Sequence, residues 1–290
     1  MNRFRGVGAT MRLRFGWSSA CVSAMTVVMM LAAPPPATPQ RPPVRTLDIA
    51  VEDAADPWSR ADGSGYANDI VRAAFRAAGI TVRLHVMPYA RCKGMVIDAK
   101  ITACFSMSPD LRPATGITLS DKPLFECMSA FVMSRNGRIK ATRASELPRG
   151  TVVGAVLGYE YPAAVRDLER SGAITLQYAA SEQTNLRKLV AGRIDLAIVN
   201  YNELKTLEYV SANAGVATKV QAAFVAGMLK SYIGFNDAHS QSAWARAQFN
   251  KGAAIIASSG ELAAIRGSWS DHIRIATRTG TIAEKVEGDQ

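Results

Sequence analysis

Apolar and polar positions alternate along the first half of the folded region in a way that predicts α/β structure. Residues 47–51 and 101–105 are apolar runs of strand length, and residues 81–86 alternate apolar and polar side chains. Between them, residues 69–78 and 88–97 place apolar side chains at helical spacing. The order strand, helix, strand, helix, strand predicts a mainly parallel sheet covered by helices.

The same succession returns between residues 152 and 200. Strands are expected at 152–156, 174–178 and 195–200, with helices at 162–170 and 181–190. Two such units in tandem predict two α/β lobes with a ligand between them. The remaining elements expected are strands at 129–133 and 232–235 and helices at 242–258 and 260–269.

The N-terminal segment has the pattern of a secretory signal. Basic residues precede an apolar, uncharged stretch at 15–33, and a proline-rich stretch follows. Residues 1–33 are therefore expected to be a signal peptide and 34–45 a semi-extended linker, which places the mature protein in the periplasm. An uncleaved membrane anchor is the alternative, because the apolar stretch is just long enough to span a bilayer.

Charge and missing motifs narrow the classes of function. The 290-residue chain carries a formal net charge of +10 at pH 7, and its basic residues are spread out after the leader. A basic block or aromatic ladder, typical of nucleic-acid binding, does not occur. Dinucleotide, phosphate-loop, metal and Ser–His–Asp patterns do not occur either. We therefore expect that the protein binds no nucleic acid, metal or cofactor and that it is not an enzyme.

Cys92, Cys104 and Cys127 remain once the leader is removed. An odd number leaves at least one thiol unpaired, or paired between chains. Cys104, inside an expected strand, is interpreted as a buried core thiol, and a Cys92–Cys127 bridge is the disulfide that an oxidising periplasm would allow. Nothing in the sequence fixes the distance between those two, so the sequence leaves open whether any disulfide forms.

Candidate binding chemistry follows the expected strand at 101–105. Two hydroxyls, Ser106 and Ser108, come directly after it, and Arg112 stands close behind. Hydroxyls and backbone N–H groups at a strand end suit a small carboxylate, which a guanidinium holds through two parallel hydrogen bonds. The alternative is a turn with an N-cap serine and a surface arginine.

Two motifs carry a resemblance to a known family. Residues 106–112 (SMSPDLR) and 119–125 (LSDKPLF) resemble the T-I-T-x-E-R … F-S-x-P-Y signature of family 3 solute-binding proteins, the periplasmic receptors of polar amino-acid ABC transporters. The resemblance extends over residues 46–273. It implies a type II periplasmic binding protein fold, in which two lobes, each a mainly parallel sheet flanked by helices, are joined by two hinge strands.

The domain organisation follows from the same resemblance. It places residues 46–133 and 232–273 in lobe 1 and residues 134–231 in lobe 2. After residue 273 the polar segment 274–290 is expected to be a flexible tail.

The resemblance implies that Arg112 grips the ligand carboxylate, and the positions of other residues suggest a hypothesis for the rest of the site. Arg112, with Ser106 and Ser108, holds the ligand carboxylate on lobe 1. Tyr159 and Glu160, at the expected start of a helix, close from lobe 2 together with Asn200. The aromatic residue Trp58 or Tyr89 covers an apolar part of the ligand.

Two positions bear on how an amino group is recognised. Glu52, at the end of the first strand, stands where the family often holds the ligand's amino group; a solvated loop acid is the alternative. Asn200 stands where the family usually has an aspartate that binds the α-ammonium, and asparagine carries no charge. Either Glu52 or Glu160 compensates, or the ligand lacks an ammonium group.

The function expected from these residues is that of a non-catalytic, monomeric receptor. It captures a small carboxylate-containing solute, an amino acid or an organic acid, and hands it to an ABC transporter permease. One alternative is an enzyme resembling periplasmic cyclohexadienyl dehydratases, with Glu160 or Glu52 as the acid. The other is a sensor domain held to the membrane by an uncleaved leader.

Overall fold

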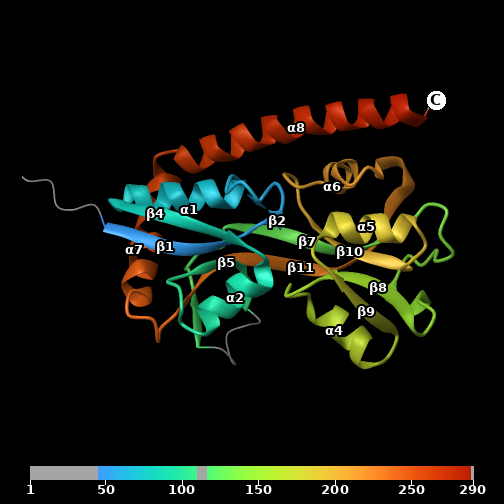
Figure 1. Ribbon diagram of the computed structural model, residues 1–290, viewed down its shortest axis with the longest axis horizontal. Helices are drawn as coiled ribbons and strands as arrows, with labels where there is room; N and C mark the ends of the chain where they lie inside the picture. Colours follow the sequence, from blue (N-terminus) through green and yellow to red (C-terminus); the bar gives the residue numbers. More distant parts are fainter. Residues whose placement is uncertain (1–44, 110–115, 289–290) are drawn as a thin grey trace, which may run out of the picture. The chain divides into compact units, whose positions relative to one another are not determined.

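A computed structural model describes residues 45–109 and 116–288 of the chain (Figure 1). The expected signal peptide, the linker up to residue 44 and Arg112 lie outside the described residues. The strands are β1 (Arg45–Glu52), β2 (Ala54–Ala55), β3 (Ser59–Arg60), β4 (Ile80–Met87), β5 (Cys104–Met107), β6 (Ile117–Leu119), β7 (Phe125–Ser134), β8 (Thr151–Val156), β9 (Ile174–Ala179), β10 (Leu196–Tyr201) and β11 (Val220–Asn236). The α-helices are α1 (Tyr66–Ala77), α2 (Tyr89–Ile97), α4 (Ala163–Arg170), α5 (Glu182–Val190), α6 (Leu207–Asn213), α7 (Ser242–Ser258) and α8 (Glu261–Gly288).

Within the described residues, a nine-stranded sheet has the order β4-β1-β5-β11-β7-β10-β8-β9, with β6 paired to β11. At one end β1 pairs in parallel with β4 and β5, and at the other β8 pairs in parallel with β9 and β10. The expectation of two α/β units, each with a mainly parallel sheet, is therefore confirmed.

The long strand β11 serves both units. It has 17 residues; residues 232–236 pair with β5 and β6, whereas residues 220–231 pair with β7. Strand β7 in turn pairs with β10 from Met128 onward. Residues 128–133 of β7, which are expected in lobe 1, therefore lie beside β10 of the second unit. Below, lobe 2 means residues 125–231, and lobe 1 means the described residues before and after it.

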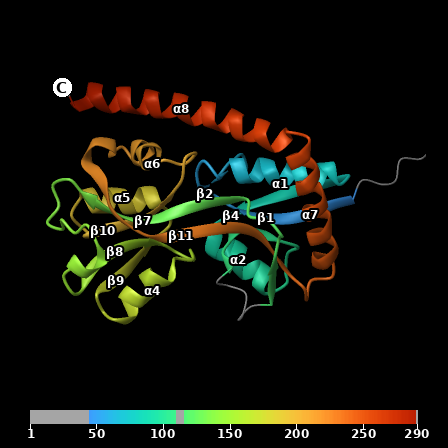
Figure 2. The same cartoon turned by 180° about the vertical axis from the view of Figure 1, so that it is seen from behind.

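Helices cover both faces of the sheet. Helices α1, α5 and α6 lie on one face and α2 and α4 on the other, as Figure 1 and the view from behind in Figure 2 agree. Helix α8 runs along the first of these faces and packs against α1 and α7 of lobe 1 and also against α6 of lobe 2. It continues to Gly288 and so includes most of the segment 274–290, which was expected to be a flexible tail. Among the described residues, no helix has both the length and the apolar character needed to cross a bilayer.

Helices α1 and α7 approach each other closely at Gly252. A Cβ atom at this position would lie 1.7 Å from the carbonyl oxygen of Ala74, so any side chain forces the helices apart. We expect Gly252→Ala to lower the free energy of unfolding by about 1–3 kcal/mol in urea titrations. Gly267→Ala on α8 is the matched control: its Cβ meets nothing within 4 Å, and relief of glycine's flexibility should stabilise the protein by about 0.5–1 kcal/mol. Equal effects at both positions would contradict the close approach.

The interpretation of Cys104 as a free core thiol is wrong, and the Cys92–Cys127 bridge that the sequence left open is not formed. Cys92 on α2 is bonded to Cys104 on β5, with the Cα atoms 5.8 Å apart, and Cys127 is a buried free cysteine. Helix α2 packs directly on β5, so the helix and the strand that follows it bring together two cysteines only 12 residues apart. Cys127 lies on β7, and burial raises the pKa of its thiol to about 12.

Candidate functional site

One cavity between the lobes gathers the residues that the sequence analysis selects, except Arg112, which lies outside the described residues. Lobe 1 and lobe 2 both contribute to its lining. The selected residues that line it are Glu52, Trp58, Tyr89, Ser106, Ser108, Tyr159, Glu160 and Asn200. Their role in ligand binding stays a prediction, but the fold brings them together.

Strand ends and one helix start supply the lobe 1 side. Glu52 is the last residue of β1 and only 3 % exposed, and Tyr89 begins α2. Ser106 lies inside β5, which ends at Met107, two residues later than the expected strand. The carboxyl ends of the parallel strands β1 and β5 thus face the same space, as open α/β sheets require of their ligand sites.

The turn between β8 and α4 supplies the lobe 2 side. Gly158 has a φ of +89°, and a Cβ there would lie 2.9 Å from Ala90 of α2. Glycine therefore allows this turn to approach lobe 1 and to present Tyr159 and Glu160 to it. Asn200, on β10, also lines the cavity and is 5 % exposed.

Carboxylates and phenols hold the two lobes together across the cavity. The Tyr159 hydroxyl donates to the Glu52 carboxyl. Glu160 accepts a hydrogen bond of 2.8 Å from the Tyr89 hydroxyl and lies 2.9 Å from the Lys93 ammonium. Glu52 of lobe 1 therefore has a donor from lobe 2, and Glu160 of lobe 2 has donors from lobe 1. These contacts across the cavity mean that the structure describes a closed form, with the two lobes in contact.

Burial dominates the electrostatics of the two acids. It raises the pKa of Glu52 to about 8, against the opposing effect of the Tyr159 hydrogen bond and the Lys205 charge. Burial also raises the pKa of Glu160, but the Lys93 charge and hydrogen bond lower it. Glu52 is thus mainly a neutral carboxylic acid at pH 7, while Glu160 has a cation beside it.

Free space in the cavity amounts to about 40 Å³, which is room for roughly three water molecules. An amino acid needs more than this, so a ligand of that size has to displace the contacts between the lobes. Several buried polar atoms in the lining have no hydrogen-bond partner among the described residues. They are Trp58 Nε1, Ser106 Oγ, Asn200 Oδ1 and Ser231 Oγ.

No family model and no curated protein matches the sequence. Solved structures do match. The ligand-binding core of GluR0 from Nostoc punctiforme, in complex with L-glutamate, superposes with a TM-score of 0.63 at 18 % identity, over 77 % of this chain and 98 % of that one. A histidine kinase sensor domain similar to periplasmic binding proteins matches with a TM-score of 0.64 at 18 % identity, over 79 % and 97 %. An ancestral amino-acid-binding protein, a precursor of cyclohexadienyl dehydratase, matches with a TM-score of 0.60 at 13 % identity, over 77 % of this chain and 94 % of that one.

The chain has the two-lobed fold of the periplasmic binding proteins. This is the fold that the resemblance of residues 106–125 implies, and the similar structures include several amino-acid-binding proteins.

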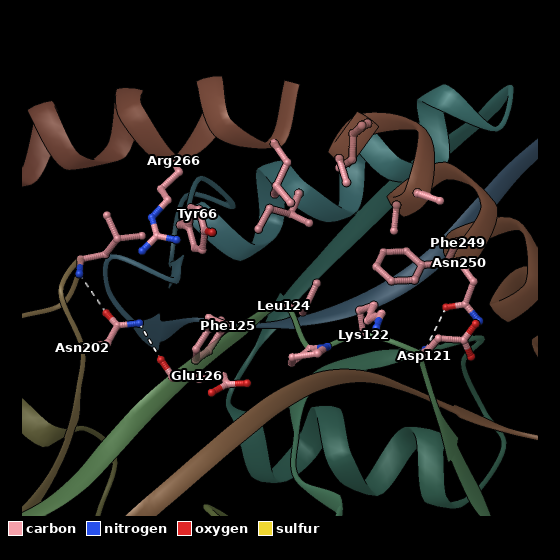
Figure 3. A pocket seen from close by; sticks show the side chains of 18 of the residues that line it. Tyr66, Asp121, Lys122, Leu124, Phe125, Glu126, Asn202, Phe249, Asn250 and Arg266 are labelled. Atoms are coloured by element: carbon pink, nitrogen blue, oxygen red, sulfur yellow. Dashed lines mark hydrogen bonds between the residues drawn. The ribbon is translucent and has the colours of Figure 1, made fainter. Parts of the chain in front are cut away.

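This periplasmic-binding-protein fold has a second and larger cavity (Figure 3), whose lining, among the described residues, shares only Phe125 with that of the inter-lobe site. Its volume is about 660 Å³, and α1, α7, α8 and the segments at 121–126 and 202–204 line it. Arg266 and Tyr66 lie toward one end, and Lys122, Phe249 and Asn250 toward the other. Phe125 lines both cavities, and its ring stacks on Trp58 of the smaller cavity at a centroid distance of 4.1 Å.

We select the smaller cavity as the candidate site on chemical grounds. It contains a buried acid with a raised pKa and several unpartnered polar atoms, which are the features of sites that act on a ligand. None of the buried unpartnered side-chain atoms of the described residues belongs to the lining of the larger cavity.

Sequence reasoning missed two lysines of the periplasmic-binding-protein cleft. Lys93, in the middle of α2, holds Glu160. Lys205 is 1 % exposed, pairs with Glu182 and lies 4.1 Å from the centre of the Trp58 ring. Glu182 follows the serine cap of α5, a position that by itself indicates only a helix start. A lysine inside an amphipathic helix or a loop carries no signal that distinguishes it from a surface residue.

Proposed function

We propose that this protein is a solute-binding receptor of an ABC importer. It captures a small carboxylate-containing solute between its lobes and presents the closed form to a permease in the periplasm. The observation that carries the proposal is the convergence of polar groups from both lobes on one inter-lobe cavity. The fold adds support, because structures described with bound glutamate, arginine or histidine share it.

A thermal-shift screen tests the proposal. A ligand that binds the folded state and not the unfolded chain raises the melting temperature, and the rise grows with the logarithm of the ratio of ligand concentration to Kd. Amino acids and organic acids with small side chains should include at least one that raises the melting temperature at millimolar concentration. A broad screen in which no acid has any effect would contradict a receptor for such solutes.

Arg112 is proposed as the residue that grips the ligand carboxylate. Charge-assisted hydrogen bonds contribute about 1.5–3 kcal/mol each, so Arg112→Ala should weaken binding of the identified ligand by at least about tenfold. Arg112→Lys should restore only part of the affinity, because an ammonium lacks the two-pronged geometry. Calorimetry on the wild type and both variants measures this, and unchanged affinity in Arg112→Ala would exclude the role.

An enzyme on the same fold is the second candidate, and the raised pKa of Glu52 favours it. A carboxyl with a pKa of about 8 is protonated at neutral pH and suited to act as a general acid. The precursor of cyclohexadienyl dehydratase among the similar structures has this fold. Incubation with prephenate or arogenate tests the candidate: product that disappears in Glu52→Gln would favour the enzyme, and absence of product favours the receptor.

A sensor is the third candidate, because a histidine kinase sensor domain has the same fold. The mature N-terminus distinguishes it from the receptor. A first residue between 33 and 45 fits an exported receptor, whereas a full-length chain in the membrane fraction fits a tethered sensor.

A further inference from the structure

In the described closed form, each carboxylate that lines the inter-lobe cavity, Glu52 or Glu160, already has a hydrogen-bonding partner. Glu160 already has the Lys93 ammonium at 2.9 Å and the Tyr89 hydroxyl at 2.8 Å. Glu52 receives the Tyr159 hydroxyl and is 3 % exposed. Burial raises the pKa of Glu52 to about 8, so its carboxyl carries little charge at pH 7.

The acids just outside the cavity are paired as well. Glu182 bonds to the Lys205 ammonium, and it accepts the backbone N–H of Asn200 at 2.7 Å. Asp56 pairs with Arg60, and Glu126 lies 3.0 Å from Lys230. Asp53 does not line the cavity. In the described form, Glu52 is mainly neutral and Lys93 offsets the charge of Glu160, so these groups give the cavity no net negative charge.

The polar atoms without a partner in this lining are all uncharged. Ser106 Oγ and Ser231 Oγ can donate and accept, Trp58 Nε1 donates and Asn200 Oδ1 accepts. On the neighbouring strand β7, Ser129 is paired with Asn200 across the sheet, and its hydroxyl also lacks a partner among the described residues. Such a set satisfies hydroxyl, oxo and carboxyl oxygens of a ligand. It leaves an ammonium group desolvated without a counter-charge, which is strongly unfavourable.

We propose that the cleft selects small oxygen-rich acids without an ammonium group, such as 2-hydroxy acids, over α-amino acids, and that Asn200 determines this choice. The inference rests on the proposed solute-binding function. It assigns the neutral amide of Asn200, 5 % exposed at the end of β10, to the ligand's 2-hydroxyl or 2-oxo group.

Matched pairs of ligands test the inference. Each pair differs only by ammonium or hydroxyl at the 2-position: L-alanine and L-lactate, L-aspartate and L-malate, L-phenylalanine and L-3-phenyllactate. In calorimetry at pH 7, the hydroxy acid of at least one pair should bind the wild type at least about tenfold more tightly than its partner. Equal or tighter binding of the amino acids would overturn the inference while the receptor function stands. Binding of neither class would overturn the proposed function, and the inference with it.

Asn200→Asp supplies the missing charge and should reverse the preference. We expect the affinity for the amino acid of the pair to rise at least about tenfold and that for the hydroxy acid to fall. Asn202→Asp is the control: it makes the same change two residues away, outside the lining of this cavity, and should leave the preference of the wild type unaltered. A folded Asn200→Asp variant, judged by its melting temperature, with unchanged preference would exclude Asn200 as the determinant. If Asn200→Asp does not fold, the wild-type panel alone decides the preference, and the neutral Asn200→Ser, expected to weaken the hydroxy acid without gaining the amino acid, tests the residue.

Discussion

Replacing Lys205 by methionine should lower the free energy of unfolding by about 3–5 kcal/mol, because it leaves a buried carboxylate without its partner. The side chains of Lys205 and Glu182 are 1 % and 4 % exposed and form an ion pair. In the variant, Glu182 keeps the backbone N–H of Asn200 at 2.7 Å as a donor but has no cation. Urea unfolding at pH 7 measures the loss.

An exposed ion pair provides the control for this experiment. Lys100 lies 2.7 Å from Asp98, with both side chains more than half exposed, and Lys100→Met should change stability by less than about 0.5 kcal/mol. The double variant Lys205→Met with Glu182→Gln should recover more than half of the loss, since no buried charge is then left alone. A loss below about 1 kcal/mol in Lys205→Met would mean that the pair is hydrated in solution.

The wild type should lose stability relative to Glu52→Gln as the pH rises from 5 to 9. The pKa of Glu52 is about 8 in the folded protein and 4.5 as the ordinary value. Between these values the folded state binds more protons than the unfolded chain, so the free energy of unfolding falls with rising pH. It stops falling above pH 8, where both states are ionised. At about 1.4 kcal/mol for each pKa unit, the upper bound is roughly 5 kcal/mol.

Chemical denaturation of both proteins at several pH values checks this. The comparison with Glu52→Gln cancels the contribution of the histidines and of the other acids. Glu169→Gln, at an exposed position of α4, should keep the pH profile of the wild type. Parallel profiles for the wild type and Glu52→Gln would mean that Glu52 is ionised and hydrated in the folded protein.

Periodicity alone predicted the elements whose limits are set locally. The helix expected at 242–258 is α7, Ser242–Ser258. Ser181 caps α5 as expected, since its hydroxyl accepts the backbone N–H of Thr184. In both cases the residues that define the element are neighbours in sequence, so their spacing carries the information.

Strand limits depend on partners that are distant in the chain, and there the sequence was less informative. The strand expected at 101–105 is observed at Cys104–Met107, where β1 and β11 flank it. The strand expected at 232–235 is the end of a strand that starts at Val220, because residues 220–231 find β7 as a partner. Pairing over such separations leaves no pattern in a single sequence.

The candidate site, like the fold, was predictable only where its residues lie at positions that the local sequence marks. Residues at strand ends and helix starts were found because those places face a ligand in α/β sheets. The partners that set their charge state, Lys93 and Lys205, come from a helix interior and a loop. Their importance arises from burial beside an acid, which only the three-dimensional arrangement reveals.

Trp58 contacts both lobes, so the surroundings of its indole ring change when the lobes separate. The indole belongs to lobe 1, yet it stacks on Phe125 and has the Lys205 ammonium 4.1 Å from its centre, both from lobe 2. When the lobes separate, water replaces the Phe125 ring and the Lys205 ammonium beside the Trp58 indole. Trp244 and Trp269, on α7 and α8, do not line the cleft. The ultraviolet emission of Trp58 in an unlabelled sample is therefore expected to differ between the open and the closed form.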